Sequence, residues 1–533
     1  MNKIKKIISV ILTVLIFSSV FSASTTVFAT EYNEYVEAEA YEEKLLTETV
    51  DEETEKAEII CEIPEKRDEY SKTYKRADGS YTQIFSNSPL HIKKNDKWEN
   101  IDNRLISDDN SIKNNNGKFE VEFPETLSQN DKITVANGNE SISFSVNDIE
   151  PSEGVVDTSS EENTDIITED LAKTVSGITY ENIDENTDVQ YIVSPDSVKE
   201  NIIVYDKDSL KDTYSFDIEK GNLTVLLDDG NNLIFKNEND EAVFTIPAPV
   251  MTDADNEASY DIGVTVENAD KTVLTLTYTP SKEWLTASDR EYPVVIDPVI
   301  SFVDGDDLLI EDTAIINDAS DLTRRNTNYS NSVEGYIAGR DTLTGNILVK
   351  LNLDAFSCFR QANVEVTDVS YYGDGYVIGG NALVKPIIGS WDCETITYDD
   401  VFPSGSTETP VITYENTVVD YFTGVPDQNP THGATNVRFN ITTLFKEWLS
   451  GERANDGFVI VPENSAAYGV LYLAGDYLAP QQTLRFHTHC AVDYVDASGN
   501  NDSYEYLTQE IGRAGTASVN PFSRGLSLSR SDI

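Results

Sequence analysis

Short runs in which apolar residues recur at every second position are found along most of the chain, and they limit the fold more than any other feature. The clearest runs cover 119–123, 142–146, 223–227, 274–278 and 347–353. Successive side chains of a strand point to opposite faces, so each run predicts a strand with one buried face. Between the runs stand dipeptides such as Asp78-Gly79 and Asn137-Gly138, which tolerate the positive φ of tight hairpins. The sequence therefore predicts a mainly β protein built from antiparallel sheets.

The N-terminus has the layout of a secretory signal peptide. Lys3, Lys5 and Lys6 form a basic start, 7–20 is almost entirely apolar, and small residues lead to a cleavage site after Ala29. A membrane anchor is the alternative, but the apolar run is short for a bilayer span and no stop-transfer pattern follows. We therefore expect a secreted or cell-surface protein without a membrane span once residues 1–29 are removed.

The chain is strongly acidic. It carries 39 Lys and Arg against 94 Asp and Glu, a net charge of −55. Nucleic acid and anionic lipid bind basic patches, so this excess of acid predicts that neither is a partner. Acidic residues dominate 30–66, a stretch expected to be a disordered or loosely helical spacer.

Two β-rich regions are expected on either side of Asp297-Pro298. The first covers 67–300, the second covers 303–492, and a polar tail rich in Gly and Ser follows over 493–533. In the second region, Leu444, Phe445 and Trp448 recur at the spacing of one helical face. Gly451 can end this helix. One short helix is therefore predicted among the strands, at an end of the β-sandwich.

Several short pieces of the second region occur in a characteristic order. The pieces are 312–315, 326–330, 336–340, 348–353, 391–398, 439–442, 448–451 and 455–458. Together they resemble the DNRLRE-type domain, a jelly-roll class of carbohydrate-binding module. Ser330, Asn352 and Tyr398 depart mildly from the residues usual in that family. The resemblance implies a jelly-roll β-sandwich that binds cell-wall or other extracellular polysaccharide.

Two further resemblances flank this block. The upstream pieces 78–81, 98–103, 189–191, 199–202 and 284–298 look like the N-terminal region of bacterial wall-associated proteins. Downstream, 510–520 is similar to the lead-in of an RHS (YD-repeat) shell, which in that family often encloses a C-terminal toxin. These resemblances imply either the front end of a truncated or split RHS-type surface protein or a front end that acts alone. No toxin activity is carried over to these residues.

A strip rich in Tyr and Gly in the second region is the candidate carbohydrate site. Tyr371, Tyr372 and Tyr376 lie close together in the sequence, with Arg340 as a hydrogen-bonding partner. Sugar sites combine aromatic rings with a few polar groups that fix hydroxyls. Alternatively, the tyrosines are half-buried members of a sheet, where tyrosine is common.

An acidic segment between the two regions is the candidate calcium site. Asp304, Asp306 and Asp307 could supply oxygen ligands to Ca²⁺, which binds six to eight oxygens. The alternative is an acidic turn between domains. No other cofactor is expected.

The histidines and cysteines leave further alternatives open. His487 and His489 point to one face of a strand beside Cys490, so they either hold a metal or are exposed histidines. The four cysteines, which also include Cys61, allow three pairings. Of these, Cys358 and Cys393 either form a disulfide or remain isolated buried thiols.

No motif in the chain places an acid, base or nucleophile for catalysis. His-Glu-x-x-His and Gly-x-Ser-x-Gly patterns are both absent from the sequence. We therefore expect a non-catalytic protein. The first hypothesis is a secreted module that binds cell-wall or extracellular polysaccharide. The alternative is a structural stalk or adaptor of an RHS-type toxin-delivery protein, without affinity for glycans.

Overall fold

The computed structural model confirms a mainly β protein. It describes residues 57–108, 111–156, 166–228, 230–254, 258–288, 290–297, 299–302, 309–319, 322–329, 334–339, 343–360, 364–404, 409–424, 435–472, 482–489, 507–510, 516–519 and 526–529. The signal peptide with Ala29 and most of the predicted spacer lie outside these ranges. The strands form two bodies, each with its own core, and they pair antiparallel in both.

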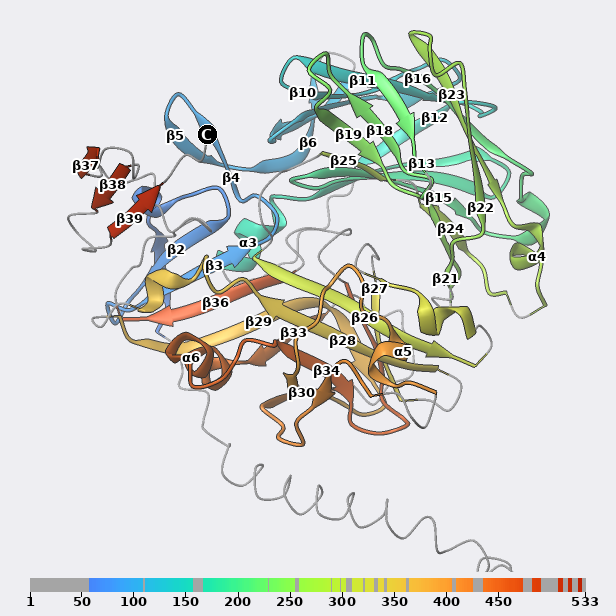
Figure 1. Cartoon of the computed structure of the whole chain (residues 1–533). Coiled ribbons are helices and arrows are strands. Elements are labelled where there is room, and N and C mark those ends of the chain that lie inside the picture. The colour runs from blue at the N-terminus through green and yellow to red at the C-terminus, as the bar shows by residue number, and fades with distance from the viewer. Residues whose placement is uncertain are drawn as a thin grey trace, which may run out of the picture. The chain divides into compact units, whose positions relative to one another are not determined.

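The first body, here called the two-sheet body, contains an eight-stranded and a twelve-stranded sheet (Figure 1). The eight-stranded sheet runs in the order β22 (Ile262–Glu267), β23 (Val273–Pro280), β16 (Tyr214–Glu219), β11 (Glu140–Val146), β10 (Ile133–Asn137), β8 (Glu120–Pro124), β7 (Ser111–Asn116) and β6 (Asp102–Asp108). The twelve-stranded sheet runs in the order β17 (Thr224–Leu227), β18 (Leu233–Lys236), β19 (Ala242–Ile246), β25 (Val299–Phe302), β15 (Ser197–Val204), β14 (Thr187–Val193), β13 (Ser176–Asp184), β12 (Ser152–Val156) and β9 (Thr126–Leu127). Three strands complete it beside β15: β20 (Val250–Thr252), β21 (Ala258–Ser259) and β24 (Val294–Asp297).

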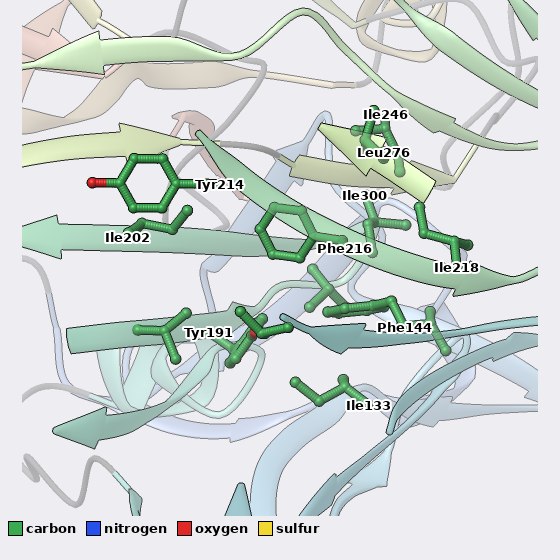
Figure 2. Packing of buried hydrophobic residues seen from close by; sticks show 14 of the residues in the cluster. Ile133, Phe144, Tyr191, Ile202, Tyr214, Phe216, Ile218, Ile246, Leu276 and Ile300 are labelled. Carbon is green, nitrogen blue, oxygen red and sulfur yellow. The ribbon is translucent and has the colours of Figure 1, made fainter. Parts of the chain in front are cut away.

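The apolar faces of these two sheets meet in one core (Figure 2). Phe144 of β11 and Phe216 of β16 come from one sheet, and Tyr191 of β14 comes from the other. Tyr191 lies 5.4 Å from Phe123 and 6.0 Å from Phe144 between ring centroids. In β11, the alternation over 142–146 that predicted the strand also places Ile142, Phe144 and Val146 in this core. The β10–β11 hairpin turns at Gly138, whose φ of 61° is the positive value expected there.

The second body, here called the fourteen-stranded body, follows the path β1 (Ile59–Glu62), β2 (Ser71–Arg76), β3 (Tyr81–Ser86), β36 (Gln482–Thr488), β29 (Val366–Ile378), β35 (Tyr468–Tyr472), β27 (Glu334–Gly339), β28 (Leu343–Leu351), β34 (Phe458–Pro462), β30 (Asn381–Ile388) and β31 (Thr413–Tyr414). Off this path, β26 (Ile310–Asp318) pairs with β28, β32 (Asp420–Thr423) with β30, and β33 (Thr435–Asn440) with β29. The predicted helix is α6 (Thr442–Ser450), which buries Leu444, Phe445 and Trp448 and ends at Gly451 with φ 75°. Trp391 is buried as well.

The N-terminal strands β1 to β3 belong to the fourteen-stranded body, although the sequence grouped 67–300 as one region. Strand β3 pairs with β36 from Tyr81↔Thr488 to Ser86↔Thr483, and Figure 1 shows the two strands side by side. Phe85 enters the core of this body, with its ring centroid 5.3 Å from that of Phe356 and 5.2 Å from that of Phe486. The residues of 59–86 thus protect β36, which would otherwise be an open edge.

The remaining elements are short. Helix α3 (Ile166–Ala172) places Ile167 and Leu171 against Tyr74 and Ile84. The others are α4 (Lys282–Leu285), α5 (Tyr398–Val401), the 3-10 turns η2 (Pro64–Lys66), η3 (Lys207–Ser209), η4 (Leu322–Asn326) and η5 (Ser357–Arg360), the hairpin β4 (His91–Lys94) and β5 (Lys97–Asn100), and a three-stranded sheet of β37 (Leu507–Glu510), β38 (Thr516–Val519) and β39 (Leu526–Ser529). Within the described ranges, every helix is too short or too polar to cross a membrane.

Candidate functional site

Strand β29 separates the tyrosines that the sequence grouped as a sugar site. Tyr371 is 0% exposed in the core and lies 5.6 Å from Phe458 between ring centroids. Burial raises the pKa of its hydroxyl. A ring enclosed in this way is not available to a sugar. Tyr372 points to the opposite face and is half-buried, while the side chain of Tyr376 lies outside the described part, as does Arg340.

The outer face around Tyr372 is polar and rich in arginine. The guanidinium of Arg485 on β36 lies 3.8 Å from the centroid of the Tyr372 ring. On β33, Arg438 donates from Nε to Ser370 Oγ at 3.1 Å and pairs with Asp368 at 3.2 Å. Its side chain is 30% exposed. An aromatic ring beside two guanidinium groups is an arrangement that can bind hydroxyl-rich or anionic ligands.

The described residues contain no cluster of three or more His, Cys, Asp or Glu arranged to hold a metal ion. Asp304, Asp306 and Asp307 lie outside these residues, so the calcium site stays a prediction. His487 belongs to β36, and His489 Nδ1 accepts a hydrogen bond from the Glu365 amide at 3.1 Å. Cys490 is also outside the described part of the chain.

No disulfide joins the cysteines that the structure describes. Cys358 is buried in the core of the fourteen-stranded body, and Cys61 is exposed on β1. The thiol of Cys393 donates to the Asp312 carbonyl at 2.9 Å, and burial raises its pKa to about 12. Of the two alternatives for Cys358 and Cys393, the structure therefore shows separate thiols and not a disulfide.

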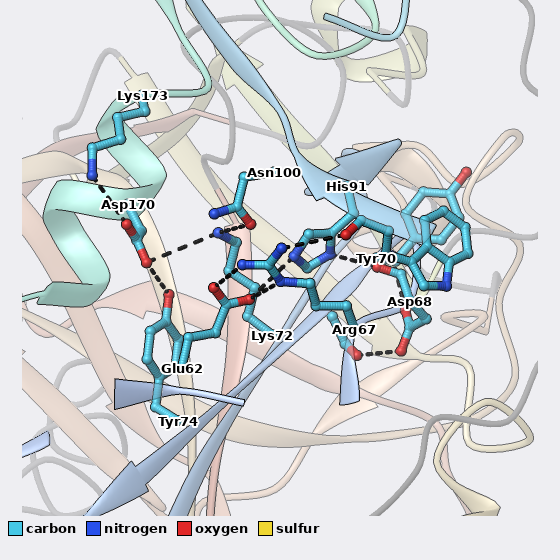
Figure 3. Close-up of polar contacts among 12 residues, drawn as sticks. Glu62, Arg67, Asp68, Tyr70, Lys72, Tyr74, His91, Asn100, Asp170 and Lys173 are labelled. Atoms are coloured by element: carbon cyan, nitrogen blue, oxygen red, sulfur yellow. Dashed lines mark hydrogen bonds and ion pairs between the residues drawn. The ribbon is translucent and has the colours of Figure 1, made fainter. Parts of the chain in front are cut away.

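A cluster of charged side chains, unforeseen from the sequence, lies under helix α3 where β1, β2 and β4 meet (Figure 3). Glu62 accepts two hydrogen bonds from Arg67, at 2.7 and 2.5 Å, and lies 3.3 Å from His91 Nε2. Lys72, which is 1% exposed, donates to Asn100 Oδ1 at 3.1 Å. These contacts fasten the N-terminal segment to the sheet with charge as well as with apolar packing.

Burial shifts the titration of this cluster in both directions. Burial alone would raise the pKa of Glu62, but hydrogen bonds from His91 and Arg67 hold that pKa well below its usual range. Burial lowers the pKa of Lys72 and of His91, and it raises the pKa of Asp68 to about 7. The folded state therefore keeps Glu62 charged and Asp68 partly protonated at neutral pH.

A second set of buried ionisable groups lies in the two-sheet body, on pieces that resemble wall-associated proteins. Tyr191 donates to Glu200 Oε1 at 2.5 Å beside a cavity of about 20 Å³, and Lys199 Nζ lies 2.6 Å from Asp297 Oδ2. Burial raises the pKa of Glu200 to about 8, against the Tyr191 hydrogen bond and with a contribution from Asp297. The fold thus brings Asp297 to residues about a hundred positions earlier in the chain, which no spacing in the sequence indicated.

Glu200→Gln is expected to make the two-sheet body more stable at pH 8 and less sensitive to pH. The folded protein binds the carboxyl proton of Glu200 more tightly than the unfolded chain does. The free energy of unfolding of the wild type therefore falls as pH rises from 4.5, the ordinary pKa of a glutamate, to about 8, its pKa in the folded protein. This fall in the free energy of unfolding is on the order of 5 kcal/mol. Urea unfolding at pH 5 and pH 8 measures it, and equal pH dependence in the variant and the wild type would contradict the assignment.

Comparison with known proteins gives relatives of low identity and no matching family model. A tRNA3(Ser)-specific nuclease WapA of Bacillus spizizenii is 26% identical over 263 residues, which are 47% of this chain and 11% of that protein. The tRNA nuclease WapA of Bacillus subtilis is 24% identical over 259 residues, again 47% and 11%. A wall-associated protein of Geobacillus stearothermophilus is 27% identical over 203 residues, 36% of this chain and 75% of that protein.

The solved structures that resemble this chain are too distant to indicate a function. An exo-β-1,3-galactanase of Phanerochaete chrysosporium covers 76% of this chain and 100% of its own, at 7% identity and a TM-score of 0.11. The N-terminal domain of a Streptococcus gordonii adhesin covers 81% and 93%, at 7% identity and a TM-score of 0.13.

The nuclease relatives correct two expectations drawn from the sequence. The chain was expected to be non-catalytic and to have no nucleic-acid partner, whereas proteins similar to it are named as tRNA nucleases. The exclusions fail for a physical reason. Net charge is a sum over a whole surface, and a search for familiar motifs covers only known arrangements of catalytic groups.

The matched lengths differ between the two kinds of relative. The chain matches 11% of the length of the nucleases, and the expected DNRLRE-type domain is not confirmed by any family model. The resemblance to wall-associated proteins is supported, because one such protein is matched over 75% of its length. This chain is therefore similar to wall-associated surface proteins, and the similarity indicates a place at the cell surface.

Proposed function

We propose that this chain is the wall-located structural part, a stalk or adaptor, of a surface protein that delivers a tRNA-cleaving activity. The observation that carries the proposal is the similarity to a wall-associated protein over 75% of that protein's length, together with the similarity to the WapA nucleases. The fold suits a support, since two large β cores and buried ion pairs resist local opening.

Fractionation of cells that export the full chain tests this proposal. We expect the protein in the wall fraction, and we expect the purified chain to co-sediment with isolated cell walls. Recovery entirely from the culture medium, without sedimentation on walls, would overturn the wall-located role.

A contact with wall glycan through the outer face of β29 is a second candidate, supported by the Tyr372–Arg485 stack and by the partly exposed Arg438. The aromatic ring would pack on a sugar and the guanidinium groups would bind hydroxyls or anionic groups. In this form, the stalk itself holds the polysaccharide.

Tyr372→Ala is then expected to weaken binding to isolated walls about tenfold, the equivalent of roughly 1.4 kcal/mol. Tyr205→Ala is the matched control, because Tyr205 is 47% exposed in the two-sheet body. Sedimentation at a series of wall concentrations measures the affinity. Equal affinity of the Tyr372 variant and the wild type would reject the glycan contact and leave the stalk without glycan affinity.

A further inference from the structure

The buried contact between Lys199 and Asp297 joins two strands of the two-sheet body. Their side chains are 7% and 6% exposed, and Nζ lies 2.6 Å from Oδ2. In the ladders of β15, Ile202 pairs with Ile296 on β24 and Lys199 pairs with Val299 on β25. Asp297 thus stands diagonally across from Lys199, a spacing of roughly 7–8 Å between main chains that a lysine side chain can span.

This pair differs chemically from the other deeply buried ion pairs. Among the described residues, the other pairs in which both side chains are under 10% exposed are Arg290–Asp253 and Arg324–Asp318. A guanidinium stays charged and is no nucleophile at the pH of a cell. A lysine amine, by contrast, loses its proton readily when it is buried, and it then carries a reactive lone pair.

The surroundings of Asp297 favour its uncharged form. Burial raises the pKa of Asp297, against the pull of Lys199. The second carboxylate oxygen, Oδ1, is buried and accepts no hydrogen bond in the described part of the chain. A carboxylate that lacks hydrogen bonds on one oxygen is poorly stabilised as an anion, so proton transfer from the ammonium to the carboxylate becomes favourable. Such a transfer would leave a neutral amine in contact with a carboxylic acid, and the low exposure of both side chains limits the access of water.

We propose that Lys199 and Asp297 form an amide cross-link between their side chains. The amine lone pair attacks Cγ of Asp297, and the new C–N bond forms as one C–O bond breaks. The departing oxygen leaves as water with the acid proton and one amine proton. The step needs no oxidant, reductant or co-reactant, and it changes the mass of the chain by one water molecule. The geometry supplies what the reaction requires, namely proximity and exclusion of water.

Such a bond would tie β15 to β24 and close the long chain segment between them. Both residues lie in segments that resemble wall-associated proteins. The proposed wall role gives Lys199 and Asp297 no function of their own. The cross-link is independent of that role. A wall-bound protein without it would disprove only the cross-link, and a cross-linked protein that is absent from walls would disprove only the wall role.

The intact mass of the exported full chain, with its N-terminus determined by sequencing, tests the proposal. We expect the wild-type protein to be one water molecule lighter than its sequence, and Lys199→Arg and Asp297→Ala to show their full masses. Lys132→Arg is the matched control, since Lys132 forms an ion pair with Glu219 that is 53% and 43% exposed. This variant should keep the loss of water.

A tryptic digest locates the bond. Loss of water at an Asp-Gly step would also lighten the chain, but only the cross-link produces a branched peptide that joins the segments around Lys199 and Asp297. A wild-type protein of full mass, or one that yields the two peptides separately, would overturn the proposal. The digest of the wild-type protein is decisive even where a variant fails to fold.

Discussion

Replacing Phe85 with alanine is expected to lower the free energy of unfolding of the fourteen-stranded body by about 3–5 kcal/mol. The ring is 0% exposed and makes edge contacts with Phe356, Phe359 and Phe486 at 5.3, 6.0 and 5.2 Å. Alanine would leave a cavity between these rings, all three of which come from distant parts of the chain. Since Phe85 sits on β3, the loss also loosens the strand that covers β36.

Urea unfolding followed by tryptophan fluorescence measures the effect, because Trp391 and Trp448 are buried in this body. Phe402→Ala is the matched control. Phe402 is 38% exposed in the same body, so its removal should cost less than about 1 kcal/mol. If the Phe85 and Phe402 variants unfolded at the same urea concentration, the N-terminal strands would not be part of this core.

Glu62→Gln, in the cluster of charged side chains under α3, is expected to lower the free energy of unfolding by about 3–5 kcal/mol at neutral pH. The substitution keeps the shape of the side chain and removes the charge that Arg67 and His91 contact. Lys72, which is 1% exposed, also loses the field of this carboxylate. Buried cations without a compensating anion are costly, so the effect should far exceed that of an exposed pair. Glu219→Gln, whose partner Lys132 is 53% exposed, is the control.

The same residue sets the direction of the response to acid. The folded-state pKa of Glu62 is lowered, so its contribution to stability is complete above the ordinary value of 4.5 and is lost as pH falls below it. Urea unfolding at pH 7 and pH 3.5 should show a larger loss for the wild type than for Glu62→Gln. A variant as sensitive to acid as the wild type would show that Glu62 titrates normally in the folded protein.

The strands over the alternating runs and the single predicted helix followed from local patterns. Alternation over 142–146 and 274–278 identified strands of the eight-stranded sheet, and the spacing of Leu444, Phe445 and Trp448 identified α6. Both signals are hydrophobic periodicities, which can be recognised in a segment without knowing which other parts of the chain it contacts. Alternation fixes the face that a strand buries, but it names no partner strand.

For that reason, the pairing of β3 with β36 could not be foreseen, nor could the contact of Glu62 with His91. At the candidate sugar site, the opposite orientation of successive side chains in a strand already indicates part of the outcome. Tyr371 and Tyr372 are adjacent, so a strand must turn one inward and the other outward, and the structure buries Tyr371. The Lys199–Asp297 pair depends on sheet register, which appears only once strands are aligned.

The pairing of β3 with β36 constrains the order in which the parts of the protein can fold. Phe85 and Phe486 lie roughly 400 residues apart in the chain, and such distant contacts form slowly. During synthesis or passage through an export channel from the N-terminus, the β2–β3 hairpin emerges long before its partner strand exists. Until then its edge is open to wrong pairings. The fourteen-stranded body therefore cannot fold completely until β36 has emerged, and until then the chain can still pass through a narrow channel. The large excess of negative charge would help to keep the unfolded segments from associating.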